Sequence, residues 1–464
     1  MPVSGARLKI LCFIETDLEI RHFLQSGALQ PLFEHHDVKL VFPPDGYRRI
    51  KCDIATLNLS TPIERVGIPD ERQAVWKYAF HHDQMQIRIG YGWWRLWKVW
   101  WRQIGWKAAL MFSLANLPVI RPTVRRHWIK ALAQVPATDL EALLDREQPD
   151  LLLHPSCFAG CFINDLIVEG KKRGIPTVLL MNSWDNPSIK RATSGKPDWV
   201  AVWGEQTRRH TAHFMGIPPE RIVILGAAQF DIYRGPPRIT PAQFRQEHGI
   251  PLDNKVLLYA GSSKGCRESL HLEWLNDAIA AGDLGKLTVV YRPHPWGISR
   301  QEAETILSAK WPHVRIENSM REFLEHIRQG TQKEGFMMAE YARTHDVLSS
   351  VDAVISPLST IILESALHGL PVMCFFPSEE EKISHWRGMR KLVHFEDLYK
   401  SPGVIVADSY AAFLPKTKDL LKRAGDHGLR KELAQQMTYF VQYHQKKYGE
   451  GLLELVSIAA GPRN

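Results

Sequence analysis

The sequence lacks several features that mark common classes of protein. Its six cysteines include no Cys-x-x-Cys pair, so no thiol redox motif or disulfide framework is indicated, and free thiols in a reducing compartment are expected. No apolar run is long enough to span a bilayer. The apolar stretch Leu8–Ile14 is followed at once by Glu15, Asp17 and Glu19, which predicts a first β-strand and not a secretory signal. A cytoplasmic location is therefore expected.

The length and composition predict two folded domains. The chain has 464 residues, too many for one ordinary core, with 45% apolar and 23% charged residues. Its net charge of +8 favours an anionic partner of open type. Short apolar segments alternate with helical segments that end in glycine, the βαβ pattern of a parallel sheet covered by helices. The expected strands are Leu8–Ile14, Val38–Phe42, Leu151–His154, Thr177–Met181, Trp199–Trp203, Ile222–Leu225, Val256–Ala260, Thr288–Tyr291, Val314–Ile316, Ala353–Ile355 and Val372–Phe376.

A cluster of prolines interrupts this alternation between residues 234 and 255, where no strand is expected. We interpret that stretch as a linker. Residues 1–233 then form an N-terminal Rossmann-like domain, and residues 256–464 form a second such domain with C-terminal helices. The predicted fold class is α/β, with two facing doubly wound domains.

An acid-free segment from residue 84 to residue 136 holds nine Lys or Arg residues, and six of the chain's fifteen tryptophans fall between residues 91 and 122. Tryptophan favours the membrane–water interface and basic residues favour anionic headgroups, so one interpretation is an interfacial helix on an anionic membrane surface. The other is a core helix with a solvated basic face, because Trp93, Trp97, Trp100 and Trp101 share one helical face. A nucleic-acid partner is not expected, since no recognisable motif accompanies the charge.

An Arg-Pro-His-Pro sequence follows the expected strand Thr288–Tyr291. Its two prolines forbid a helix and hold the intervening histidine in an extended conformation. Ligands of open parallel sheets bind beyond the carboxyl ends of the strands. Arg292 and His294 are therefore candidate ligand-binding residues, held rigidly at such an end.

A loop of small residues follows the expected strand Val256–Ala260. It begins with Gly261, Ser262 and Ser263, and the amides of such a loop can surround an oxyanion. This loop is a second candidate for binding phosphate at the same sheet edge.

A helix is expected after the strand Ala353–Ile355. Ser359 is expected as its N-cap, with Thr360 opening the helix and Gly369 ending it. A helix start in that position can bind an anion such as phosphate. Glu364 lies one turn further along the same face, where its carboxylate can accept hydrogen bonds from the vicinal hydroxyls of a ribose.

These three motifs together resemble the C-terminal domain of GT-B fold glycosyltransferases. The resemblance is greatest to the branch that holds surface-polysaccharide transferases and CDP-glycerol glycerophosphotransferases. The segments NSWDNPSIK and PDWVAVWGEQTRRHTAHFMGIPPERIVILGAAQFDIY are also similar to bacterial glycosyltransferase-like proteins, and the likeness covers roughly residues 149–398. It implies that His294 and the Ser359–Thr360 helix start bind the donor diphosphate, that Glu364 binds the ribose, and that the segment containing His394 approaches the cleft. Arg292 and His294 are then predicted to meet the diphosphate leaving group at the end of their strand, and His294 is a catalytic candidate because it would stabilise the charge that grows there.

The resemblance also implies that protein groups, and not a metal, manage the leaving group. The chain has no Asp-x-Asp sequence, which metal-dependent glycosyltransferases of the other common fold normally show. Two His-His-Asp triplets, at residues 35–37 and 81–83, would point adjacent side chains to opposite faces of a strand and so would not close around one ion. No metal and no cofactor are expected, the nucleotide-activated sugar being a substrate.

An inverting transfer needs a base that deprotonates the acceptor hydroxyl, normally from the N-terminal domain. Asp17 follows the first strand, His154 ends a third, and Asp185 lies in a polar loop between Asn182 and Asn186. Asp185 is the preferred catalytic candidate because its neighbours are polar and it follows a strand. The alternative is that it only builds an Asx turn.

The favoured prediction is a glycosyltransferase that moves a sugar from a nucleotide-activated donor to a cell-surface glycan or a lipid-linked acceptor. It would work in the cytoplasm, on the inner face of the cell membrane. The alternatives are a CDP-polyol phosphotransferase, a nucleotide-sugar 2-epimerase and a non-catalytic nucleotide-binding protein.

Overall fold

The computed structural model describes residues 7–85, 97–98, 101–102, 104–156, 160–189, 195–261, 263, 265–294, 297–331, 340–383, 386, 389–443 and 446–461. The chain divides into two compact units. Unit 1 comprises residues 1–231 and 438–464, and unit 2 comprises residues 232–437.

Unit 1 is built on a seven-stranded sheet in which every strand is parallel to its neighbours. The order is β3-β2-β1-β4-β5-β6-β7, so the chain reverses its direction of travel across the sheet between β1 and β4. The central strands are buried on both faces, as is usual in parallel sheets, because helices cover both sides. The strands are β1 (Lys9–Phe13), β2 (Asp37–Phe42), β3 (Ile63–Arg65), β4 (Leu151–His154), β5 (Thr177–Leu180), β6 (Trp199–Val202) and β7 (Ile222–Ile224).

Helices cover the two faces of this sheet with separate apolar cores. One core includes α2 and α21, and the other includes α7 and α8. A third, smaller cluster joins α3 to α6 around Trp76, Ala79 and Trp128. The α-helices of unit 1 are α1 (Asp17–Glu19), α2 (Gln30–His35), α3 (Asp70–Gln84), α5 (Trp106–Ala115), α6 (Arg121–Gln134), α7 (Thr138–Glu147), α8 (Ile163–Arg173), α9 (Asn186–Ile189), α10 (Glu205–His210) and α21 (Tyr448–Ala460).

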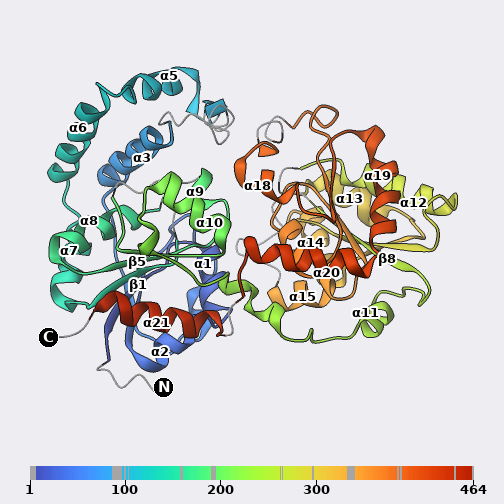
Figure 1. The fold of residues 1–464 in the computed structure, drawn as a ribbon, viewed down its shortest axis with the longest axis horizontal. Coiled ribbons are helices and arrows are strands. Elements are labelled where there is room, and N and C mark those ends of the chain that lie inside the picture. The colour runs from blue at the N-terminus through green and yellow to red at the C-terminus, as the bar shows by residue number, and fades with distance from the viewer. Residues whose placement is uncertain are drawn as a thin grey trace. The chain divides into compact units, whose positions relative to one another are not determined.

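The last helix belongs to unit 1, although the sequence placed residues 438–464 in the second domain. Tyr448, Leu452, Leu455 and Val456 of α21 are buried in the same apolar core as β1 and α2. Figure 1 shows α21 beside α2 and below β1 and β5, in the part of the picture that holds the N-terminus. The apolar face of α21 packs against this side of the first sheet and completes its core. The order of elements along the chain does not reveal this packing.

Unit 2 is built on a six-stranded parallel sheet with the order β10-β9-β8-β11-β12-β13. The chain reverses across this sheet between β8 and β11, which makes their carboxyl ends a topological switch point. The strands are β8 (Lys255–Ala260), β9 (Leu287–Arg292), β10 (Val314–Ile316), β11 (Ala353–Ser356), β12 (Val372–Phe375) and β13 (Val404–Ala407).

One apolar core joins this sheet to α12, α13, α14 and α19, while α16 contacts β11 and β12. The α-helices of unit 2 are α11 (Pro241–Glu247), α12 (Glu268–Ala280), α13 (Arg300–Ser308), α14 (Asn318–Gln329), α15 (Tyr341–Leu348), α16 (Ile361–Leu367), α18 (Val393–Leu398), α19 (Tyr410–Arg423) and α20 (His427–Gln436).

The stretch interpreted as a linker, residues 234–255, is largely ordered structure within unit 2. Thr240 and Gln243 form a capping box that starts α11, and Phe244 of that helix is fully buried. The boundary between the units lies after Asp231, close to the predicted end of the first domain at residue 233.

Candidate functional site

Three neighbouring strands of unit 2 end in the loops that the sequence singled out. Gly261 follows β8, and its N–H donates a hydrogen bond of 2.8 Å to the carbonyl of Arg292. A Cβ on Gly261 would lie 2.5 Å from a Glu268 oxygen and 2.9 Å from the His294 nitrogen, so only glycine fits this close approach. The structure thus brings Gly261 and the backbone of His294 together. Ser263 follows two residues after Gly261, and Ser262 lies outside the described residues.

A set of buried polar side chains lies against this loop, and the sequence analysis did not find it. The Tyr291 hydroxyl donates to Glu268 at 2.5 Å, and Glu268 is almost fully buried at the start of α12. The Tyr259 hydroxyl lies 2.7 Å from His271 Nδ1, and His271 Nε2 lies 3.1 Å from Glu381. Burial raises the pKa of Tyr291, which therefore remains a proton donor. The sequence did contain a sign of this cluster, because Tyr259 and Tyr291 each lie one residue before the end of neighbouring strands.

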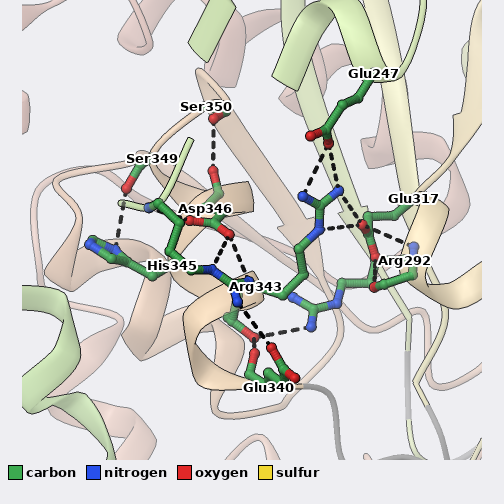
Figure 2. A network of polar contacts seen from close by, with 12 residues as sticks. Glu247, Arg292, Glu317, Glu340, Arg343, His345, Asp346, Ser349 and Ser350 are labelled. Carbon is green, nitrogen blue, oxygen red and sulfur yellow. Dashed lines mark hydrogen bonds and ion pairs between the residues drawn. The ribbon is translucent and has the colours of Figure 1, made fainter. Parts of the chain in front are cut away.

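Arg292 points into the protein and not into open space. Its side chain is buried, and Nη2 donates to Thr344 Oγ1 at 3.0 Å. Figure 2 labels Arg292 near Glu317 and Arg343, and the Arg343 guanidinium lies 2.8 Å from Glu317. Burial alone raises the pKa of Glu317, but the charges of Arg292 and Arg343 outweigh it and hold the pKa below its ordinary value. The described contacts of Arg292 therefore secure the end of β9 from within.

The loop after β11 differs from its expected form. Thr360, and not Ser359, is the N-cap of α16, and its side chain makes no capping hydrogen bond. The Ser359 hydroxyl instead lies 3.3 Å from that of Ser356. The helix that follows ends at Leu367, and Gly369 takes the left-handed conformation just beyond it, close to the expected end.

Glu364 is buried in α16, and its carboxylate has a protein partner. The Tyr233 hydroxyl donates to Glu364 Oε2 at 2.5 Å, and the Tyr233 ring packs edge-on against His368. His368 in turn lies 2.9 Å from His345. Burial lowers the pKa of His368 to about 4, so this imidazole is neutral at neutral pH. Tyr233 orients Glu364, a contact across 131 residues of chain that no local pattern predicts.

The carboxyl edge of the unit 1 sheet carries a buried ion pair at its own switch point. Glu15, just beyond β1, lies 3.3 Å from Nε2 of His154, which ends β4. The N–H of Cys161 donates to the other Glu15 oxygen at 2.6 Å, and a Cβ on Gly160 would overlap this carboxylate. Burial alone raises the pKa of Glu15, but the hydrogen bond and charge of His154 outweigh it and lower the pKa to about 2. The sequence identified His154 but not its partner.

The remaining candidates of unit 1 are spread along this edge. Asp17 accepts hydrogen bonds from the N–H groups of Lys51 and Cys52, each at 3.0 Å, so it ties two loops together. Asn182 is buried at the end of β5, and its side-chain amide has no hydrogen-bond partner among the described residues. Asp185 is half-buried in the next turn, where the Asn186 amide approaches it at 3.5 Å. In unit 2, His394 is buried in α18.

Glu19 in this edge gives a pH-dependent prediction. It accepts a hydrogen bond of 2.7 Å from the N–H of Glu15, and burial together with the Glu15 charge raises its pKa to about 8. In the unfolded chain Glu19 ionises at about pH 4.3. Between these pH values the folded protein binds more protons, so its free energy of unfolding falls as the pH rises. Glu19→Gln should remove this part of the slope, measured by urea unfolding between about pH 5 and pH 8.

Glu34→Gln is the matched control, because Glu34 is exposed on α2. This variant should keep the slope of the parent protein. An unchanged slope in Glu19→Gln would mean that Glu19 is ionised in the folded protein.

The described residues of the basic, tryptophan-rich segment include both buried and exposed aromatic and apolar side chains. Trp128 packs in the α3–α6 cluster, as a core residue would. Trp106, Leu110 and Leu114 lie on one face of α5 and are 57%, 50% and 52% exposed. The indole N–H of Trp97 donates to the Ser113 hydroxyl at 2.9 Å, so the Trp97 side chain contacts α5. Trp93 and Trp100 lie outside the described residues.

None of the described helices combines the length and apolar character that crossing a bilayer requires. Within the described ranges, no three His, Cys, Asp or Glu side chains gather as a metal site would need.

Comparisons with known proteins confirm the fold class. No family model matches the chain, and no curated protein matches it. A solved structure of S. aureus MnaA with UDP has a TM-score of 0.54 at 9% identity and covers 97% of this chain and 96% of its own. A glycosyltransferase from Rickettsia africae gives 0.52 at 10% identity, with 99% and 100% covered. A UDP-GlcNAc 2-epimerase from Neisseria meningitidis bound to UDP-GlcNAc gives 0.53 at 12% identity, with 97% and 99% covered. The chain therefore has two doubly wound α/β units of the GT-B type, as predicted.

Proposed function

We propose that the protein transfers a sugar from a nucleotide-activated donor to a cell-surface glycan or a lipid-linked acceptor. The observation that carries this proposal is the gathering of Gly261, His294 and the Ser359–Thr360 loop beyond three adjacent strands, β9, β8 and β11. Ligands of open parallel sheets bind at such an edge. Of the three solved structures compared above, one is named a glycosyltransferase and two were solved with UDP or UDP-GlcNAc, which supports the same choice.

The donor half of the proposal assigns the diphosphate to the Gly261–Ser263 loop, His294 and the Ser359–Thr360 turn. As the bond between the anomeric carbon and the diphosphate breaks, negative charge grows on the leaving phosphate oxygens. Fixed donors aimed at those oxygens stabilise the transition state more than the ground state. Arg292 acts from within by securing β9, and Glu364, oriented by Tyr233, is our candidate for the ribose hydroxyls.

The acceptor half assigns Asp185 as the base. It would take the proton from the acceptor hydroxyl while the acceptor oxygen bonds to the anomeric carbon. The Glu15–His154 pair lies at the same sheet edge, and Glu15 holds His154 in one orientation. We propose that neither a metal nor a cofactor takes part.

A membrane surface completes the proposal. The exposed apolar face of α5 and the basic residues of α6 would meet an anionic leaflet, where a lipid-linked acceptor is found. Each cation close to such a leaflet contributes about 1 kcal/mol. We therefore propose that the enzyme works at the cytoplasmic face of the membrane.

A panel of nucleotide sugars and CDP-polyols, with thermal unfolding as the measurement, tests the donor class. At a ligand concentration a hundredfold above Kd, the matching donor should add about 2.7 kcal/mol to the stability of the folded state. Stabilisation by a nucleotide sugar supports the transferase, whereas stabilisation by CDP-polyols alone would make the protein a polyol phosphotransferase. If no nucleotide raises the unfolding temperature, the proposal is wrong.

A nucleotide-sugar 2-epimerase is the second candidate, because proteins of that name share the fold. The stabilising nucleotide sugar, incubated with the protein and without acceptor, separates the two reactions. An epimerase inverts the sugar at C2 and leaves the nucleotide attached. A transferase leaves the donor intact until an acceptor is supplied, and then releases the nucleotide.

A further inference from the structure

Unit 1 contains a cavity that is lined by helices. It lies among α3, α6, α7 and α8 and has a volume of about 680 Å³, within the range of about 300–1,000 Å³ usual for ligand sites. Most of its wall is apolar. Trp76 comes from α3, Val168 from α8, and α6 supplies Trp128, Ile129 and Leu132.

The charged groups of the cavity are paired, with one exception. Arg72 is buried and bonds Asp165 at 2.6 Å, and Lys172 lies 3.5 Å from Glu169. Arg125 also lines the cavity, yet it makes no ion pair with any described carboxylate. A spare cation beside an apolar cavity matches a ligand with an apolar chain and an anionic head.

The cavity opens onto exposed surface at one of its apolar residues. Ile129 lines it and is 60% exposed. Trp128 is more than nine-tenths buried in the cavity wall, and its indole N–H has no hydrogen-bond partner among the described residues. An apolar chain that enters past Ile129 would therefore meet a largely apolar wall.

We infer that this cavity binds the apolar chain of a phosphate-headed amphiphile, with Arg125 at the phosphate. The inference rests on the proposed function, because it assigns the cavity to the lipid portion of a lipid-linked acceptor. It commits to one molecule held in the α3–α6–α8 cavity, and not to the bilayer surface in general.

Decyl phosphate, used below the concentration at which it forms micelles, tests the inference by calorimetric titration of the full-length protein. The protein should bind it with one site per chain and should not bind inorganic phosphate. Ala133 lines the cavity at an exposed position of α6, so Ala133→Phe should narrow the cavity and weaken binding by about tenfold or more. Arg125→Gln should weaken the binding of decyl phosphate by about tenfold and leave the binding of decanol unchanged.

Two neighbouring substitutions serve as controls. Gln134→Phe introduces the same side chain at a position that does not line the cavity, and Arg126→Gln removes the adjacent cation, whose described hydrogen bonds lie within its own helix. Both should bind decyl phosphate like the parent protein. Equal losses in Arg125→Gln and Arg126→Gln would overturn the assignment of the phosphate.

Two further measurements separate this inference from the proposed function. Ala133→Phe should keep the stabilisation by the nucleotide donor and should still bind vesicles of phosphatidylcholine and phosphatidylglycerol. If the parent protein binds vesicles but not decyl phosphate, the apolar face acts only as a surface and the cavity inference is wrong. If decyl phosphate binds while no nucleotide stabilises the protein, the cavity stands and the transferase proposal fails.

Discussion

Arg292→Met is expected to lower the free energy of unfolding by roughly 2 kcal/mol, because it removes a buried hydrogen-bond donor and a positive charge that stabilises a buried carboxylate. The Glu317 carboxylate is fully buried and would lose one of its two cations, while Arg343 remains 2.8 Å away. The methionine also leaves the Thr344 hydroxyl without this donor. Urea unfolding at neutral pH measures the loss.

Arg315→Met on the neighbouring strand β10 is the matched control. The described hydrogen bonds of Arg315 go to backbone carbonyls, so its loss should cost less than about 1 kcal/mol. A stable Arg292→Met protein that no longer binds the nucleotide donor would contradict the structural role. It would restore Arg292 to the diphosphate site that the sequence predicted.

His294→Ala is expected to lower kcat/KM for the nucleotide sugar by roughly tenfold to a thousandfold, as loss of one transition-state donor does. Its backbone follows Pro293 and lies close to Gly261, so the fold should survive without the imidazole. The loss should fall mainly on kcat, because the negative charge that His294 meets develops as the diphosphate leaves.

His427→Ala supplies the control, since His427 is exposed at the start of α20. Both variants should unfold at the temperature of the parent protein. Unchanged turnover in His294→Ala, or a protein that no longer folds, would refute the assignment of His294 to the diphosphate.

Buried strands were predictable because burial on both faces leaves continuous apolar runs. Leu151–His154 and Val314–Ile316 occur as predicted, and the other nine predicted strands differ only at their ends. The two strands that the sequence analysis omitted, β3 and β13, form sheet edges. The three residues of β3 are half-exposed and include Glu64 and Arg65, so no apolar run marks them.

Sequence could predict which residues of the site lie together only where they directly follow neighbouring strands. Gly261 and His294 meet because β8 and β9 are neighbours in register, which the βαβ order implies. The partners of Arg292 and Glu364 were not predictable. Thr344 and Tyr233 lie 52 and 131 residues away, and tertiary packing selects them. A charged residue at a strand end can face the ligand or the core, and sequence does not distinguish the two.

The return of α21 to unit 1 has a consequence for synthesis on the ribosome. Domains generally fold as they emerge, the N-terminal one first. Here the core beside β1 and α2 needs Leu452 and Val456, whereas unit 2 ends at Met437. Unit 2 therefore has all its residues available before unit 1 does. Until the last helix emerges, the nascent chain exposes one apolar side of its first sheet. During this time a chaperone can bind that surface.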